Sequence, residues 1–217
     1  MIPHIVRQGD YFTSLAARVG VDAEEAWADA ANDEIRERRQ DMDQLRPGDI
    51  VYLPEGDPQA FSLSVGSDNE YTAQVTMVPI AVRLSTGLEE NVFADATYRI
   101  EPLGEEEHTT DGEGWARFEV PSYLHEVRLV FEAIERDYRI AVGHMDPIEE
   151  GSGIDMRLHH LGYIHGSLVG LPREQAELRR RTAIETFQRD QELEVTGEVD
   201  DATRDALLAA HEGASGG

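Results

Sequence analysis

The chain has 217 residues, with 44 acidic side chains, 19 basic side chains that are all arginine, and no cysteine; its formal charge is −25. A field of that sign repels phosphate groups and anionic lipid head groups, so nucleic acid and membrane surfaces are disfavoured as partners. The absence of cysteine excludes disulfides, thiolate metal sites and cysteine nucleophiles. The length fits one large domain or two to three small ones.

The first ten residues lead directly into a domain-like pattern, without the charged and apolar regions of a secretory leader. No apolar run is long enough to cross a membrane. We therefore expect a protein that is made in the cytoplasm.

Residues 2–5 and 50–53 have the composition of two short strands, and the sequence between them is helical in pattern. Thr13 is predicted to cap a first helix, and Gly20 is predicted to end it in a left-handed conformation.

A second helix is predicted to begin at the cap residue Asp22 and to continue to Asn32. The highly charged residues 33–43 that follow are predicted to form a long loop. The order is therefore strand, helix, helix and strand.

This order resembles the LysM domain over residues 3–54, and the resemblance predicts a small domain at residues 1–55 that holds N-acetylglucosamine chains between two loops. It implies that Gly9, Asp10, Tyr11 and Asn32 are candidate peptidoglycan-binding residues, with Tyr11 at the surface. The segments that carry the resemblance are His4-Ile5-Val6-Arg7-Gln8-Gly9-Asp10, Ser14-Leu15-Ala16, Ala31-Asn32 and Leu45-Arg46-Pro47-Gly48-Asp49-Ile50-Val51-Tyr52-Leu53-Pro54.

After a turn-rich linker at 55–60, apolar residues alternate in short runs that are separated by glycine-rich and acidic turns. The predicted structure is an antiparallel β-sandwich at residues 60–146. The run from Thr109 to Pro121 resembles the repeat of carboxypeptidase-regulatory-like sandwich domains, which implies an architecture but no chemistry. The predicted strands lie near 61–65, 75–84, 93–100, 115–120, 127–131 and 138–142.

The last region contains apolar residues at helical spacing near 154–161 and 183–187, with a helix stop at Gly162. Thr196-Gly197 forms a predicted turn, after which Asp200 caps a further helix.

This order of elements resembles the three-helix peptidoglycan-binding domain of cell-wall hydrolases, over a domain at residues 152–212. The resemblance implies that Tyr163, Gln188 and Arg189 line a groove for the glycan or the stem peptide, and that Phe187 lies in the core. The complete fold class is therefore multidomain α+β: a βααβ domain, an antiparallel sandwich and a three-helix bundle.

Two pairs of residues, His108 with Asp111 and His144 with Asp146, have the spacing of zinc ligands. Both pairs lie in turn-rich segments, which favours ordinary solvated side chains. The pair His159-His160 is expected at a helix end in a packing role, and the acidic runs are expected to be solvated. We predict no catalytic residue, no metal, no cofactor and no enzymatic activity.

Two functions remain open. One is a non-catalytic peptidoglycan-binding protein that is carried by, or assembled into, a contractile injection or type VI secretion machine and so reaches the periplasm or cell wall. The other is an adaptor of that machine that links spike and toxin proteins and has lost glycan binding.

Overall fold

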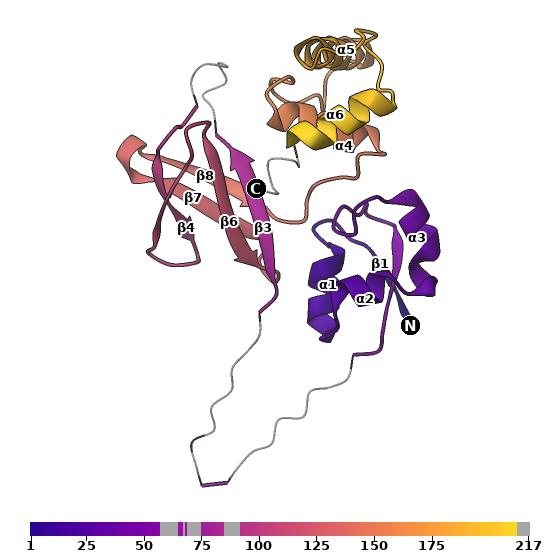
Figure 1. Cartoon of the computed structure of the whole chain (residues 1–217), viewed down its shortest axis with the longest axis vertical. Coiled ribbons are helices and arrows are strands. Elements are labelled where there is room, and N and C mark those ends of the chain that lie inside the picture. Colours follow the sequence, from indigo (N-terminus) through magenta and orange to yellow (C-terminus); the bar gives the residue numbers. More distant parts are fainter. Residues whose placement is uncertain (57–64, 67, 69–74, 85–91, 212–217) are drawn as a thin grey trace. The chain divides into compact units, whose positions relative to one another are not determined.

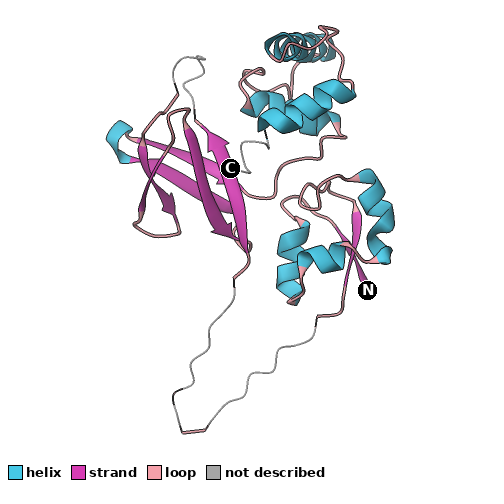
Figure 2. Cartoon of the chain, viewed as in Figure 1, coloured by secondary structure: helices cyan, strands magenta, loops and turns pink. Residues whose placement is uncertain are grey.

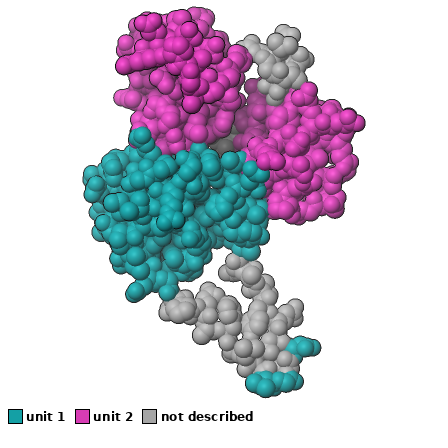
Figure 3. All heavy atoms as spheres, turned by 180° about the vertical axis from the view of Figure 1, so that it is seen from behind, with its two compact units in different colours: residues 1–78, 119–126, 141–144 teal, residues 79–118, 127–140, 145–217 magenta. Residues whose placement is uncertain are grey.

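We describe a computed structural model of the chain, which covers all residues except 57–64, 67, 69–74, 85–91 and 212–217. The described residues form two compact units, which are treated separately below (Figure 3). The first unit comprises residues 1–78, 119–126 and 141–144, and the second comprises residues 79–118, 127–140 and 145–217.

The amino-terminal region, residues 1–56, begins and ends with the two predicted strands. Strand β1 (Ile2–Ile5) pairs antiparallel with β2 (Ile50–Leu53), and Ile5 lies opposite Ile50. Both strands have the predicted boundaries. The helical elements between them are α1 (Phe12–Val19), α2 (Ala23–Trp27), the 3₁₀ turn η1 (Ala30–Asn32) and α3 (Asp33–Arg38).

The helices pack on the two strands around a single apolar core. Phe12 is fully buried and meets the edge of Trp27 with a ring-centroid distance of 4.9 Å. The buried core residues are Val6, Phe12, Leu15, Ala16, Ala26, Ile35, Leu45, Val51 and Leu53.

Two of the four predicted helix boundaries in this region are confirmed. Gly20 ends α1 at φ +74°, and the Asp22 side chain accepts a hydrogen bond from the N–H of Glu25 at the start of α2. The predicted cap at Thr13 is wrong, because α1 already begins at Phe12. The backbone N–H and hydroxyl of Thr13 instead each donate 2.7 Å hydrogen bonds to Asp43.

The predictions of one long second helix and a charged loop are also wrong. Helix α2 ends at Trp27, and the Asp29 side chain accepts from the N–H of Ala31 to start the 3₁₀ turn. The first half of the charged stretch is helical because Ile35, only 2% exposed, anchors it in the core.

The middle of the chain consists of antiparallel strands in two sheets (Figure 2). One sheet pairs β3 with β6, and the other has the order β5-β4-β7-β8. Within the second unit, Tyr98 of the larger sheet approaches Phe118 of the smaller one, with ring centroids 6.5 Å apart. The strands are β3 (Met77–Arg83), β4 (Thr97–Glu101), β5 (Glu107–Thr109), β6 (Trp115–Pro121), β7 (Glu126–Phe131) and β8 (Arg136–Ala141).

The turn before β6 explains the motif that was singled out in the sequence. The Asp111 carboxylate accepts hydrogen bonds from the N–H groups of Glu113 and Trp115, both at 2.9 Å, and Gly114 takes φ +81°. The pKa of Asp111 is lowered, first of all by the bond from Trp115 N–H. Strand β5 was not predicted, because its three residues lie at the end of an acidic run.

The helical region, residues 146–211, contains α4 (Gly151–His160), α5 (Arg173–Asp190) and α6 (Asp201–His211). The predicted core residue Phe187 is fully buried. The buried cluster is Ile148, Ile154, Leu158, Ile164, Ala183, Ile184, Phe187 and Leu207.

The structure confirms a mixed α+β multidomain fold (Figure 1). The domain limits at 1–55, 60–146 and 152–212 stay predictions. The predicted strand at 61–65 falls mostly outside the described residues. Every helix that the structure describes is too short or too polar to span a bilayer.

Candidate functional site

The helical region is organised around the amide of Gln188, which is completely buried. Its oxygen accepts from the N–H groups of Thr196 and Gly197, both at 2.9 Å. Its nitrogen donates to the hydroxyls of Thr196 and Thr203 and to the carbonyl of Glu198, at 2.8–3.1 Å. All hydrogen-bonding positions of the amide therefore serve the fold, and the prediction that Gln188 lines an open groove is corrected.

The turn held by Gln188 leads directly into α6. The Asp200 carboxylate accepts from both the N–H and the hydroxyl of Thr203, at 2.8 and 2.6 Å, which confirms the predicted cap. These hydrogen bonds lower the pKa of Asp200. Gly197 takes φ +71°, and a Cβ there would lie 2.8 Å from atoms of Arg181 and Glu185 on α5. The turn therefore needs glycine for both its backbone conformation and its contact with α5.

Tyr163 lies just after the end of α4 and is held there by a backbone turn. Gly162, at φ +88°, follows the helix, and the N–H of Tyr163 donates to the carbonyl of Leu158 at 2.8 Å. The Tyr163 ring packs edge-on against Phe187, with centroids 5.3 Å apart and an interplanar angle of 87°. The side chain is half-buried, so one part of the ring contacts the core while another part meets solvent.

Arg189 lies on α5 two residues after Phe187 and is exposed. Most other arginines of this helix are neutralised: Arg180 pairs with Asp155, and Arg181 pairs with Glu185. Among the described residues, neither Arg189 nor the exposed Arg179 forms an ion pair. Arg189 is therefore an exposed cation, close in sequence to the contact between Phe187 and Tyr163.

Arg157 is a buried residue that the sequence reasoning missed. Its guanidinium donates to the carbonyls of Asp146 and Gly153, both at 3.0 Å, and the side chain is fully buried. Gly153 is required beside it, because a Cβ there would lie 1.9 Å from the carbonyl oxygen of Pro147. The spacing Ile154-Arg157-Leu161 places Arg157 on the core face of α4, and this signal was present in the sequence.

Asn32 and Asp10, two amino-terminal candidates, make hydrogen bonds that support the fold. The buried Asn32 amide donates to the carbonyls of Ala26 and Tyr52 and accepts from the N–H of Tyr52, at 2.8–2.9 Å. The Asp10 carboxylate accepts from His4 and from the N–H of Arg7, both at 2.9 Å.

Tyr11 was predicted at the surface, and this is corrected: it is 1% exposed. Its hydroxyl donates a 2.8 Å hydrogen bond to the carbonyl of Ser122 within the first unit. Burial raises the pKa of Tyr11 to about 12, despite a smaller opposing effect of Ser14. Gly9 is also buried and takes φ +88°. Neither residue presents a surface for stacking on a sugar.

The histidines that were considered as metal ligands have other neighbours. His108 stacks on Tyr98 with centroids 5.5 Å apart, and the Nδ1 of His144 lies 3.3 Å from the Gln8 amide nitrogen. The described residues contain no group of three or more His, Cys, Asp or Glu side chains that is arranged to hold a metal ion.

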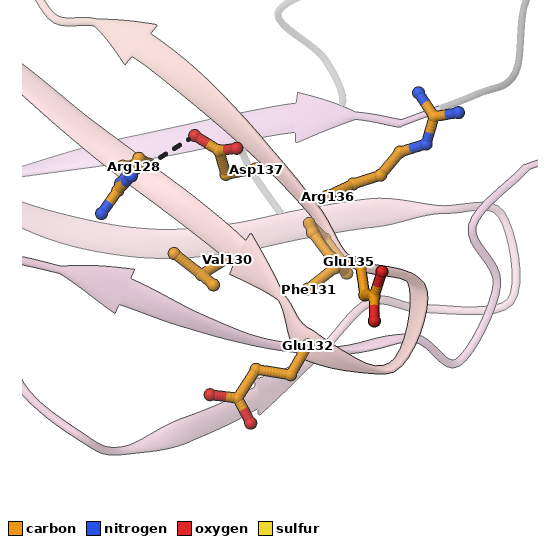
Figure 4. Close-up of a pocket in the computed structure, with 7 residues that line it drawn as sticks. All are labelled: Arg128, Val130, Phe131, Glu132, Glu135, Arg136 and Asp137. Carbon is orange, nitrogen blue, oxygen red and sulfur yellow. Dashed lines mark ion pairs between the residues drawn. The ribbon is translucent and has the colours of Figure 1, made fainter.

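A pocket of about 320 Å³ lies along the hairpin of β7 and β8, between Arg128 and Asp137 (Figure 4). Arg128 forms an ion pair with Asp137 at 3.5 Å, while Glu132, Glu135 and Arg136 point in different directions. Polar groups that orient a small ligand converge on one point. Those of this pocket do not.

The helical region thus combines the buried amide of Gln188 with a half-exposed tyrosine and an exposed arginine. Residues 154–207 match the family model described as "Putative peptidoglycan binding domain". The prediction of that family for the last region is thereby confirmed, whereas the LysM and sandwich-family resemblances stay predictions. Neither the curated proteins nor the solved structures provide a match to the chain.

Proposed function

We propose that the helical region attaches the chain to peptidoglycan without chemical reaction, and that Tyr163 and Arg189 contact the polymer. The family match at 154–207 carries this proposal. The exposure of Arg189 and the half-exposure of Tyr163 support the choice of these two residues. Gln188, the third candidate of the same region, acts in this proposal by fixing the turn that follows α5.

The chemistry of peptidoglycan suits such a pair. Its sugars present flat apolar faces between hydroxyl groups, on which an aromatic ring can stack. Its stem peptides carry carboxylates, which an arginine binds through paired N–H donors. A hydrogen bond to a charged group contributes about 1.5–3 kcal/mol, so loss of the Arg189 contact should weaken binding by about tenfold or more.

The test is retention of the purified full chain on isolated sacculi. Arg189→Ala should reduce retention by about tenfold, and Tyr163→Ala should reduce it more than Tyr163→Phe. Arg179→Ala is the matched control, because Arg179 is an exposed arginine without an ion pair on the same helix. It should retain the binding of the unmodified chain.

Equal losses for Arg179→Ala and Arg189→Ala would show that retention depends on general charge, and would remove Arg189 from the site. Absence of any retention by the unmodified chain would overturn the wall-binding proposal. Circular dichroism of each variant separates a binding effect from unfolding of the helical region.

We further propose that the chain works with a contractile injection or type VI secretion machine, which would bring it from the cytoplasm to the periplasm or cell wall. The support is electrostatic and structural. Each region contains more acidic side chains than arginines. The amino-terminal candidates Gly9, Tyr11 and Asn32 are buried in the folded structure. Both observations favour protein partners, such as spike or toxin proteins, for the rest of the chain.

Affinity purification of the full chain from cells that make it tests this association. Recovery of a spike or toxin protein together with retention on sacculi supports the first function. Recovery of such a partner without retention supports the adaptor, and absence of the partner from the eluate argues against the machine.

A further inference from the structure

Within the first unit, the start of α1 lies against two loops that follow strands of the sheets. The hydroxyls of Tyr11 and Ser14 both donate 2.8 Å hydrogen bonds to one acceptor, the carbonyl oxygen of Ser122. Tyr11, Ser14 and Ser122 are 1%, 4% and 4% exposed. A carbonyl oxygen has two lone pairs, so these two hydroxyls use its full capacity as an acceptor.

The start of α1 and the two loops fit closely because glycines lie where they are in contact. A Cβ on Gly143 would lie 2.4 Å from Tyr11 Cδ1 and 2.8 Å from the carbonyl oxygen of Gly9. On the opposite side, a Cβ on Gly9 would lie 3.2 Å from Nε2 of His144. The two surfaces therefore approach more closely than side chains at these positions would permit.

The loops that receive Tyr11 are held by their own backbone hydrogen bonds. The N–H of Ser122 donates to the carbonyl of Thr76 at 2.8 Å, and the N–H of Val142 donates to the carbonyl of His125 at 2.9 Å. The Ser122 carbonyl is thus part of a fixed backbone. Both buried hydroxyls are thus paired with a fixed acceptor, and fully satisfied buried networks of this kind rigidify a contact.

We infer that residues 8–14 form a docking surface whose occupant is the chain's own loops at 122–125 and 143–144. The docked loops cover Gly9 and Tyr11, so this face is closed to a glycan. The amino-terminal region then serves to hold these loops within the first unit rather than as a second wall-binding site. Contact with the wall is left to the helical region, as proposed above.

The direct test removes only the two hydroxyls, in the double variant Tyr11→Phe and Ser14→Ala of the full chain. Amide hydrogen exchange at Ser122 and Val142, followed by NMR, should become about tenfold faster or more, because the buried carbonyl loses both donors. Tyr123→Phe is the control, since Tyr123 lies in the same loop and is 63% exposed. It should leave both rates unchanged, and unchanged rates in the double variant would overturn the inference.

Two glycine substitutions test the same contact from the side of the loops. Gly143→Ala places a methyl group against Tyr11, whereas Gly20→Ala has the same φ of +74° and meets nothing within 4 Å. Both variants place an alanine at the same φ, so any additional increase in exchange at Ser122 for Gly143→Ala is assigned to the contact with Tyr11. Equal exchange rates at Ser122 in the two variants would contradict the inferred contact.

Two measurements on the unmodified chain complete the test. ¹⁵N relaxation should give residues 2–53 and 119–126 of the first unit the same correlation time, and different times for these two segments would overturn the inference. Addition of tetra-N-acetylglucosamine should leave the amide signals of residues 8–14 in place, and a saturable shift there would show an open glycan site. Failure of the sacculus experiment changes neither outcome.

Discussion

The amino-terminal and helical regions both bury polar side chains beside a turn, but they do so with opposite chemistry. In the first, Arg39 donates two hydrogen bonds of 2.9 and 3.0 Å to Asp49, and both side chains are 7% exposed. In the second, the buried polar group beside the turn is the neutral amide of Gln188. At these two turns, one region therefore uses a buried ion pair and the other uses a neutral hydrogen-bond network.

The two regions also differ in what their motif residues leave for a ligand. Gly9, Tyr11 and Asn32 are buried by contacts within the first unit, whereas Tyr163 and Arg189 of the helical region reach solvent. Both sets were selected by family resemblance. The contrast teaches that turn motifs identify a fold more securely than they identify a binding surface, because a turn needs particular residues whether or not a ligand is present.

The largest effect is expected from removing one partner of the buried ion pair and leaving the other in place. Arg39→Met leaves the Asp49 carboxylate buried without its guanidinium, which should destabilise the amino-terminal region by about 3–5 kcal/mol. Hydrogen exchange measured by mass spectrometry should report the loss in residues 1–56 and leave residues 151–211 unchanged.

Arg38→Met is the matched control for this prediction. Arg38 pairs with Glu34 at 3.7 Å on the surface of α3, where such pairs contribute about 0.3–0.5 kcal/mol. The double variant Arg39→Met and Asp49→Leu should regain most of the loss, because it removes both charges. Similar losses for Arg38→Met and Arg39→Met would contradict the role given to the buried pair.

In the helical region the corresponding change is Gln188→Met, which keeps the size of the side chain but removes its amide. The N–H groups of Thr196 and Gly197 then lose their acceptor, and we expect a loss of about 3 kcal/mol. Thermal unfolding and exchange in residues 151–211 measure it. Gln175→Met, at an exposed position of the same helix, should change neither.

A smaller effect is expected at the turn that Gln188 holds. Gly197→Ala puts an alanine in the left-handed region, which costs about 1–2 kcal/mol, and adds a contact with Arg181. Gly170→Ala has a similar φ of +86° but meets nothing within 4 Å. The difference between the two unfolding free energies isolates the contact, and no difference would show that only the backbone conformation requires glycine.

Much of the fold could be predicted, because it depends on local signals. The two strands around the amino-terminal helices, the caps at Asp22 and Asp200, and the helix ends at Gly20 and Gly162 all follow from residues that are adjacent in sequence. The break after Trp27 could not be predicted, because Asp29 competes for the backbone in a segment of alanines that otherwise favours helix.

The site was less predictable, because exposure depends on partners far away in the chain. Tyr11 looked like a surface aromatic, and only its contact with Ser122, 111 residues later, shows that it is buried. Gln188 was placed in a groove by family resemblance, yet its partners lie 8 to 15 residues onward. Arg157 is the exception, since its position on the apolar face of α4 was visible in the sequence.

The smallest effect distinguishes the two regions by their response to acid. His160, at the end of α4, stacks on His211 of α6, with Nδ1 and Nε2 3.0 Å apart. His160 is exposed by surface area, but packing around its ring lowers its pKa below the ordinary 6.5, and the charges of His159 and Arg157 lower it further. The folded state then holds fewer protons than the unfolded state, so this contribution is complete above pH 6.5 and is lost as the pH falls through the lowered pKa.

Acidification from pH 7.5 to 5 should therefore weaken α4 and α6 slightly while the amino-terminal region keeps its stability. There, burial opposes ionisation of Asp49, but the bonds from Arg39 and Arg46 lower its pKa below 3.8 overall, so that contribution is lost only at lower pH. Burial raises the pKa of Asp43, which acts in the opposite sense and does not weaken the region on acidification. Thermal unfolding of His160→Gln should lose part of the pH dependence, whereas the control His165→Gln, which lies outside the stack with His211, should keep it. An identical pH response in both variants would assign the effect to other groups.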